Sequence, residues 1–255
     1  INAQMIQDTS FIVSQPQFSH LFFFNNNLYL FDSTKGRLDL LNLQNKSNQN
    51  LIVSDSLKSA THLLFNNNSP YILKDNILSL VDKNNLVPKF DFSSIDTSLN
   101  ITDIDFWNGS LYLLDNRNLL IWKLSPNSTG FSAPQKWLKN DTKLEIGANS
   151  LAIDGQIWVL NHSGQIELYT SGVKEKFSQK NTINFTKATS IKTDPNSDFF
   201  VFSDNSEFIY VYRKNGEYYS KYNLSKYKIV DFAFDSANKT IYFLSSDQKI
   251  YQITL

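Results

Sequence analysis

Hydrophobic and polar residues alternate along this chain in short runs, and one pattern returns at nearly constant spacing. The segment LYLLDNRNLLIWKL starts at Leu111, and similar segments start at Leu28, Ile157, Phe199 and Ile241. Each has an alternating stretch, a polar turn and a second alternating stretch. Alternation with a period of two, broken by tight turns of Asn, Asp or Gly, predicts antiparallel β-strands rather than helices.

One aromatic residue in each segment sets the period of the repeat. With the segment PYILKDNILSLV included, the six residues are Tyr29, Tyr71, Tyr112, Trp158, Phe200 and Tyr242, which are 42, 41, 46, 42 and 42 positions apart. An apolar strand precedes each aromatic strand, and a third strand and a weaker fourth strand follow it. Four short strands in each unit of about 40–45 residues are typical of a propeller blade. We therefore predict an all-β, six-bladed β-propeller of four-stranded antiparallel blades.

The repeat also predicts where the blades begin and end. We expect a single propeller domain over residues 1–255, with blades at approximately 15–55, 56–97, 98–142, 143–182, 183–224 and 225–255. The last unit reaches Leu255 after only three strands. The segment SFIVS, residues 10–14, has no other place in the repeat, so we expect an N-terminal strand within residues 5–14 to complete the last blade. This closure would remove two exposed sheet edges.

The amino-acid composition excludes several classes of function but does not indicate one. Lys plus Arg and Asp plus Glu each total 24, so no basic excess favours a nucleic-acid partner. The absence of Cys excludes disulfides, thiolate metal sites and a Cys nucleophile. No apolar run approaches the roughly 18 residues of a membrane span, so we expect no membrane insertion by this chain. It begins with Ile rather than Met, and we expect it to be part of a longer protein.

The first strands of the six units share a polar position, which is the first set of candidate site residues. The residue before each aligned hydrophobic residue is His20, His62, Asp103, Ser150, Ser190 or Asp231. We predict that these residues form one ring at or near the propeller channel. Two His and two carboxylates could hold a divalent metal or a small polar ligand. The alternative is that these positions are polar because water fills the channel, and we predict neither a metal nor a cofactor.

A second set of candidates consists of aromatic residues for surface recognition. Phe24 and Trp107 stand where other units have Asn or Asp in a turn, and Trp122 stands at a position of mixed polarity. The third unit carries a long extra stretch with Phe131 and Trp137, and loops on a rigid scaffold are common recognition sites. The alternative that we favour is structural, with Trp137 in the core of a fourth strand and Phe131 pinning the loop.

Sequence signatures of catalysis are missing. There is no Gly-x-Ser-x-Gly elbow, no His-Glu-x-x-His and no phosphate-binding loop. Only three His are present, and nothing places one of them in a Ser-His-Asp triad. The carboxylates are scattered over turns. We therefore predict that the chain is not an enzyme.

The repeat resembles known propeller families. The unit DGQIWVLNHSGQIELY resembles the repeats of NHL-type, YWTD-type and TolB-like six-bladed propellers. Residues 105–255 more specifically resemble the C-terminal propeller of bacterial membrane proteins whose N-terminal part is similar to a PPM-type phosphatase. That resemblance implies an exported propeller tethered through a membrane segment outside this chain. No phosphatase metal-binding Asp motif is present here, so it implies no phosphatase activity.

Three functional hypotheses follow from the sequence. The leading one is a non-enzymatic binding or sensor module, extracellular or at the cell surface, that acts as a monomeric domain. Its partner would be an unidentified protein, glycan or cell-envelope ligand. The second is a hydrolase or lactonase-like metal-dependent enzyme with its site in the channel. The third is a structural scaffold without a pocket of convergent polar groups.

Overall fold

Six four-stranded antiparallel sheets make up the chain, which is an all-β, six-bladed β-propeller. The computed structural model describes residues 3–9, 16–83, 85–95, 98–180 and 183–255. None of these residues belongs to a helix with the length and apolar character that crossing a membrane requires. The chain divides into two compact units, Ile1–Phe92 with Ser225–Leu255, and Ser93–Leu224, which are described in turn.

The first unit contains three of the sheets. One consists of β2 (His20–Phe24), β3 (Asn27–Asp32), β4 (Arg37–Asn42) and β5 (Ser47–Val53). The next consists of β6 (His62–Asn66), β7 (Ser69–Lys74), β8 (Ile77–Asp82) and β9 (Asn85–Asp91). The last contains β22 (Ile229–Asp235), β23 (Thr240–Ser245) and β24 (Lys249–Thr254). β2 packs against both β6 and β22.

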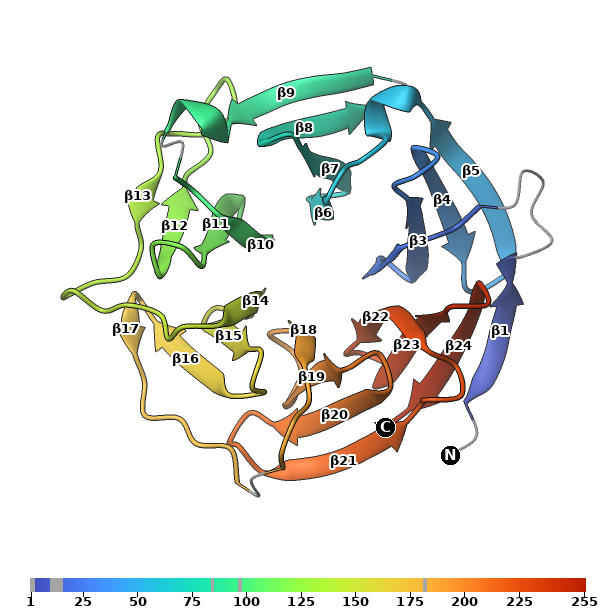
Figure 1. The fold of residues 1–255 in the computed structure, drawn as a ribbon. Coiled ribbons are helices and arrows are strands. Elements are labelled where there is room, and N and C mark those ends of the chain that lie inside the picture. The colour runs from blue at the N-terminus through green and yellow to red at the C-terminus, as the bar shows by residue number, and fades with distance from the viewer. Residues whose placement is uncertain (1–2, 10–15, 84, 96–97, 181–182) are drawn as a thin grey trace. The chain divides into compact units, whose positions relative to one another are not determined.

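An N-terminal strand completes the last blade, as the sequence predicted. β1 (Gln4–Asp8) pairs antiparallel with β24, with Met5 opposite Tyr251 (Figure 1). The predicted segment, residues 10–14, lies outside the described residues. β1 is the fourth strand of this blade and lies at its outer edge (Figure 1). Gln4 and Met5 are exposed there, so this strand needs no hydrophobic run.

The second unit contains the other three sheets. The first consists of β10 (Ile101–Trp107), β11 (Ser110–Asp115), β12 (Leu120–Leu124) and β13 (Gln135–Lys136). The second consists of β14 (Ala148–Ile153), β15 (Ile157–Asn161), β16 (Ile166–Thr170) and β17 (Val173–Lys174). The third consists of β18 (Ala188–Thr193), β19 (Phe199–Asp204), β20 (Phe208–Arg213) and β21 (Tyr218–Asn223). β14 packs against both β10 and β18.

Asn-rich turns connect the first and second strands of several blades. Asn25 and Asn26 have φ of 48° and 58°, and Asn67 and Asn68 have φ of 49° and 61°. Two consecutive residues with positive φ are typical of the tight hairpin turn whose twist matches that of its strands, and Asn tolerates this conformation better than most residues. The Asn content of the sequence therefore has a local structural cause.

The core lies between neighbouring blades. Each of four buried clusters combines side chains from two adjacent sheets of the same unit. The periodic aromatic residue contributes to this packing: Trp158 lies 5.2 Å from Phe200 of the next blade, and Tyr29 lies 4.4 Å from Phe65 of the next blade, between ring centroids. In five of the blades this aromatic residue packs in a cluster between stacked sheets, which is why the period is visible in the sequence.

Candidate functional site

The polar position of the first strands provides hydrogen bonds between blades. In the first unit, Asp231 Oδ2 accepts the backbone N–H of Leu21 at 2.8 Å. In the second unit, Asp103 Oδ2 accepts the N–H of Leu151 at 2.8 Å, and Ser150 Oγ accepts the N–H of Ile191 at 3.2 Å. In these three cases the side chain satisfies a backbone donor of the following blade. A short side chain with a hydrogen-bond acceptor at this position therefore links the first strands of two adjacent blades.

Removing one of these acceptors is expected to destabilise the protein. Ser150→Ala leaves the Ile191 N–H without its acceptor and Asp103 without the Ser150 hydroxyl, which donates at 2.7 Å. We expect urea unfolding to show a loss of about 1–3 kcal/mol in the free energy of unfolding. Ser79→Ala, which removes an equally buried hydroxyl from β8, is the control and should change stability less. Equal losses in the two variants would contradict the inter-blade role.

The two His of the predicted polar set each lie within hydrogen-bonding distance of the preceding residue. His20 Nδ1 lies 2.8 Å from Ser19 Oγ, and His62 Nδ1 lies 3.0 Å from Thr61 Oγ1. Ser190 is half-buried on β18. Within the described ranges, no three His, Asp or Glu side chains are grouped as metal ligands would be. The predicted ligand-binding role of this set stays a prediction.

The five aromatic candidates all pack on their own blades or on the adjacent core. The four contacts with measured distances are between Phe24 and Phe65 (5.6 Å), Phe131 and Phe106 (5.9 Å), Trp137 and Tyr112 (6.0 Å), and Trp122 Nε1 and Asp115 Oδ2 (3.1 Å). Trp107 packs on the cluster between the first two sheets of the second unit. Phe131 is only 9% exposed, and the other four are half-buried. Their recognition role stays a prediction.

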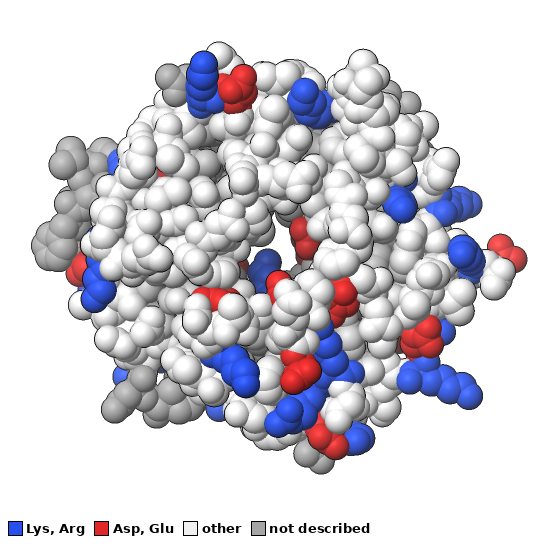
Figure 2. Space-filling view, turned by 180° about the vertical axis from the view of Figure 1, so that it is seen from behind, with Lys and Arg blue, Asp and Glu red and all other residues white. Residues whose placement is uncertain are grey.

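Charged side chains of both signs are interspersed on the face of the molecule shown in Figure 2. Oppositely charged side chains also pair within each unit, as Lys180 does with Glu217 at 3.2 Å and Lys249 with Asp247 at 2.9 Å. This distribution agrees with the equal numbers of basic and acidic residues in the sequence. Surface charge therefore does not mark a site on this face.

Asp105, on β10, has a carboxyl group with a strongly raised pKa. Its Oδ1 accepts the N–H of Phe106 at 2.8 Å, while its Oδ2 has no hydrogen-bond donor in the part of the chain that the structure describes. The pKa of Asp105 is raised to about 7, mainly by burial and to a smaller extent by the charge of Asp103, although the Phe106 N–H and the Lys192 ammonium act to lower it. Asp105 is half-buried on its strand, and a carboxyl group with such a pKa is a candidate for proton transfer.

Lys192 occupies the same position in its blade as Asp105 does in its own. Each directly follows the aligned hydrophobic residue of its first strand, Ile104 or Ile191. The blade between them has Ala152 at this position, and the charge of Lys192 acts on the carboxyl group of Asp105. Within the described residues, the Lys192 ammonium forms no hydrogen bond or salt bridge. We call Asp103, Asp105, Ser150 and Lys192 the Asp105 site.

Sequence reasoning missed Asp105 because it compared only the position before the aligned hydrophobic residue. The position after it holds Phe22, Leu64, Asp105, Ala152, Lys192 and Ala233. Four of these six aligned residues are apolar, and the other two carry opposite charges. This contrast is visible in the sequence and could have indicated the site. The effect of burial on Asp105 could not be read from these aligned residues.

The fold and this acid group define the chain as a six-bladed propeller with a proton-transfer candidate on its first strands. No protein-family model and no curated protein sequence matches the chain. Among solved structures, a gluconolactonase from Xanthomonas campestris is similar, with a TM-score of 0.69, 10% identity, and coverage of 97% of this chain and 88% of that one. The calcium-binding protein regucalcin from Agrobacterium tumefaciens has a TM-score of 0.64, 11% identity, and coverage of 99% and 93%. A chain of a nidogen/laminin complex has a TM-score of 0.61, 11% identity, and coverage of 92% and 82%.

These structures correct the prediction that the chain is not an enzyme. The gluconolactonase has the same fold over nearly the whole chain, so this fold is compatible with catalysis. The prediction was wrong because it rested on missing sequence motifs, on the small number of His and on the scatter of carboxylates along the chain. In a propeller, side chains from the first strands of different blades can combine into one site. The resemblance to six-bladed propeller repeats is supported, and the association with a PPM-type phosphatase-like part stays a prediction.

The Asp105 site does not fit a calcium ion, although one similar structure is a calcium-binding protein. Calcium takes six to eight oxygen ligands. Both carboxylate oxygens of Asp103 already accept hydrogen bonds, from Ile104, Ser150 and Leu151. Asp105 Oδ2 accepts no hydrogen bond from the described residues, but the positive charge of Lys192 acts on the same group and disfavours a cation there.

Proposed function

We propose that the chain is a hydrolase of small lactones or related esters and that Asp105 is its general base. The observation that carries this proposal is a carboxyl group whose pKa is about 7, whose Oδ2 accepts no hydrogen bond from the described residues and on which the Lys192 ammonium acts. A group with this pKa is half ionised near neutral pH, where it can both accept and return a proton. The fold that the chain shares with a gluconolactonase supports the choice of substrate class.

The proposed reaction needs one water molecule and no other reactant. Asp105 Oδ2 takes a proton from water while the water oxygen bonds to the carbonyl carbon of the lactone. The carbonyl electrons move to oxygen, and the positive charge of Lys192 stabilises that oxyanion. When the carbonyl re-forms, the ring C–O bond breaks and the leaving oxygen takes the proton from Asp105. The product is the open hydroxycarboxylic acid.

Asp103 and Ser150 would position the base rather than react. Asp103 stands two residues before Asp105 on β10, and its Oδ2 accepts the Ser150 hydroxyl and the Leu151 N–H of the next blade. These bonds hold β10 against β14. They also keep negative charge near Asp105, which helps raise its pKa. The proposed site therefore depends on both strands.

A pH–rate profile tests the proposed base. We expect kcat/KM for hydrolysis of a lactone to rise with pH through an apparent pKa of about 7 and then level off, because only ionised Asp105 accepts the proton. Lys192→Met removes a positive charge that lowers the pKa of Asp105, so the midpoint should move to higher pH. Lys187→Met, one residue before β18, should leave the midpoint in place.

The assay should follow proton release with gluconolactone, γ-butyrolactone and an open-chain ester as substrates. Turnover of at least one lactone with the expected profile supports the proposal. No turnover of any of them, or a profile that is flat between pH 5 and pH 9, overturns it.

A further inference from the structure

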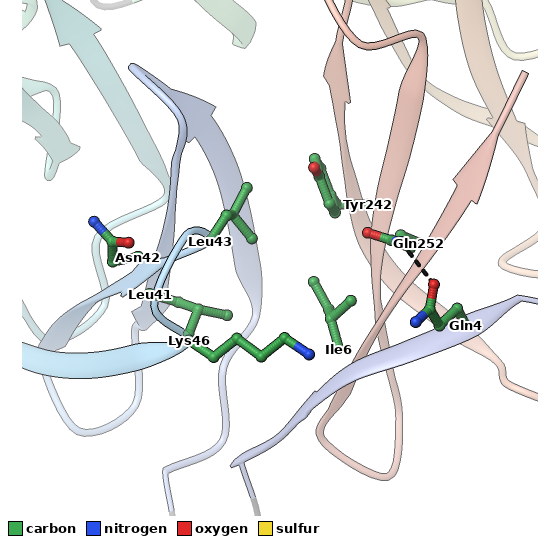
Figure 3. Close-up of a pocket in the computed structure, with 8 residues that line it drawn as sticks. All are labelled: Gln4, Ile6, Leu41, Asn42, Leu43, Lys46, Tyr242 and Gln252. Atoms are coloured by element: carbon green, nitrogen blue, oxygen red, sulfur yellow. Dashed lines mark hydrogen bonds between the residues drawn. The ribbon is translucent and has the colours of Figure 1, made fainter.

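A pocket of about 140 Å³ lies in the first unit, between the sheet completed by β1 and the β4–β5 hairpin. The residues that line it are Gln4, Ile6, Leu41, Asn42, Leu43, Lys46, Tyr242 and Gln252 (Figure 3). They come from two adjacent blades and include no residue of the Asp105 site. The pocket is therefore independent of the proposed hydrolase.

Apolar side chains from the two blades form the walls of the pocket. Leu41 and Tyr242 belong to the buried cluster between these blades, and Ile6 and Leu43 pack against the same cluster. Burial raises the pKa of the Tyr242 phenol, so that group stays neutral at ordinary pH. These walls favour a compact apolar body. An apolar cavity of about 150 Å³ is known to hold benzene, so this pocket has room for one small ring.

Polar donors border the apolar walls. Figure 3 shows the Lys46 side chain extending from the β4–β5 turn toward Ile6. Lys46 has a φ of 55°, and within the described residues its ammonium has neither a salt-bridge nor a hydrogen-bond partner. Gln252 Nε2 donates to Gln4 Oε1 at 2.9 Å, and Gln4 Nε2 has no acceptor among the described residues. No described Asp or Glu lines the pocket.

We propose that this pocket binds a small monocarboxylate with a compact apolar body. The carboxylate would contact the Lys46 ammonium and accept a hydrogen bond from Gln4 Nε2, while the apolar body lies against Ile6, Leu43 and Tyr242. A neutral molecule of the same shape would lose the charge-assisted contact. A dicarboxylate would place its second charge against the apolar wall, where no second cation balances it.

Benzoate is a suitable probe, and benzamide is its neutral counterpart. We expect saturable NMR shifts of the backbone amides around Lys46 and Gln252 on addition of benzoate to the whole chain. Benzamide should bind at least about fivefold more weakly, since it cannot form the charge-assisted contact. Lys46→Gln should reduce the affinity for benzoate to that for benzamide.

The matched control is Lys83→Gln. Lys83 is also an exposed lysine with positive φ, at 54°, in the turn between the third and fourth strands of the next blade. This variant should bind benzoate as the unmodified protein does. Equal benzoate affinity in the Lys46→Gln protein, or shifts that do not saturate or lie elsewhere on the chain, would rule the site out. Because Lys46 lies on the surface, its replacement should not affect folding.

Discussion

Replacing Asp105 with Asn is expected to lower kcat/KM for lactone hydrolysis by about 10²–10⁴-fold. The amide cannot take a proton from water, although its size and its contact with the Phe106 N–H can be kept. The measurement is the initial rate of proton release at several lactone concentrations, above the pKa of about 7 in the unmodified protein. The residual rate should no longer depend on pH near neutrality.

Stability measurements separate this loss from unfolding. Burial raises the pKa of Asp105 from 3.8 to about 7, so between these values the native protein holds a proton that the unfolded chain releases. The contribution of this group is therefore full below about pH 4 and is lost as the pH rises toward 7. Asn does not ionise, so the Asp105→Asn protein should be at least as stable as the unmodified one above pH 7.

A control replacement should leave the rate unchanged. Asp198→Asn removes an exposed carboxylate in the turn before β19 of the same unit. Full activity in a folded Asp105→Asn protein would disprove the assignment of the base. Loss of activity in both variants would point to a general effect of charge and would also count against Asp105.

Replacing Arg37 with Met is expected to lower the free energy of unfolding by about 3–5 kcal/mol. Asp39 has a fully buried side chain and accepts two bonds from the Arg37 guanidinium, at 2.7 and 2.8 Å. Asn48 and Asn50 also donate to it, at 3.0 and 2.7 Å, but neither carries charge. Without Arg37 the carboxylate would remain buried with no opposite charge. Chemical unfolding monitored by circular dichroism measures the change.

Two further variants test the cause of that loss. Arg37→Met combined with Asp39→Leu removes both charges and should recover much of the lost stability, because an apolar pair can replace a buried ion pair. Lys58→Met breaks the exposed pair with Asp55, which solvent screens, and should hardly move the unfolding midpoint. A double variant as unstable as Arg37→Met alone would show that lost packing, rather than an unpaired charge, is responsible.

The aligned third-strand position that Asp39 occupies shows what the sequence pattern could predict and what it could not. The third strands carry Asp39, Trp122, Glu167, Tyr210 and Tyr251 at one aligned position, which reads as mixed polarity. In the structure each of the two acids forms an ion pair, Asp39 with Arg37 and Glu167 with Lys174. A buried acid and a buried aromatic ring can thus replace one another across blades. The sequence contains both partners, but their pairing follows from packing.

The sequence by itself determined the repeat, the all-β class, the six blades and the turn chemistry. These features follow from interactions within about 40 residues, where alternation and turn residues act directly on the backbone. Only the tertiary structure decided which N-terminal segment closes the last blade, why the first strands carry a polar position, and that Asp105 titrates near neutral pH. The partners in these cases are remote: Leu21 meets Asp231 from 210 residues away. Asp105 acquires its pKa from burial and from charges on other positions, which no local pattern records.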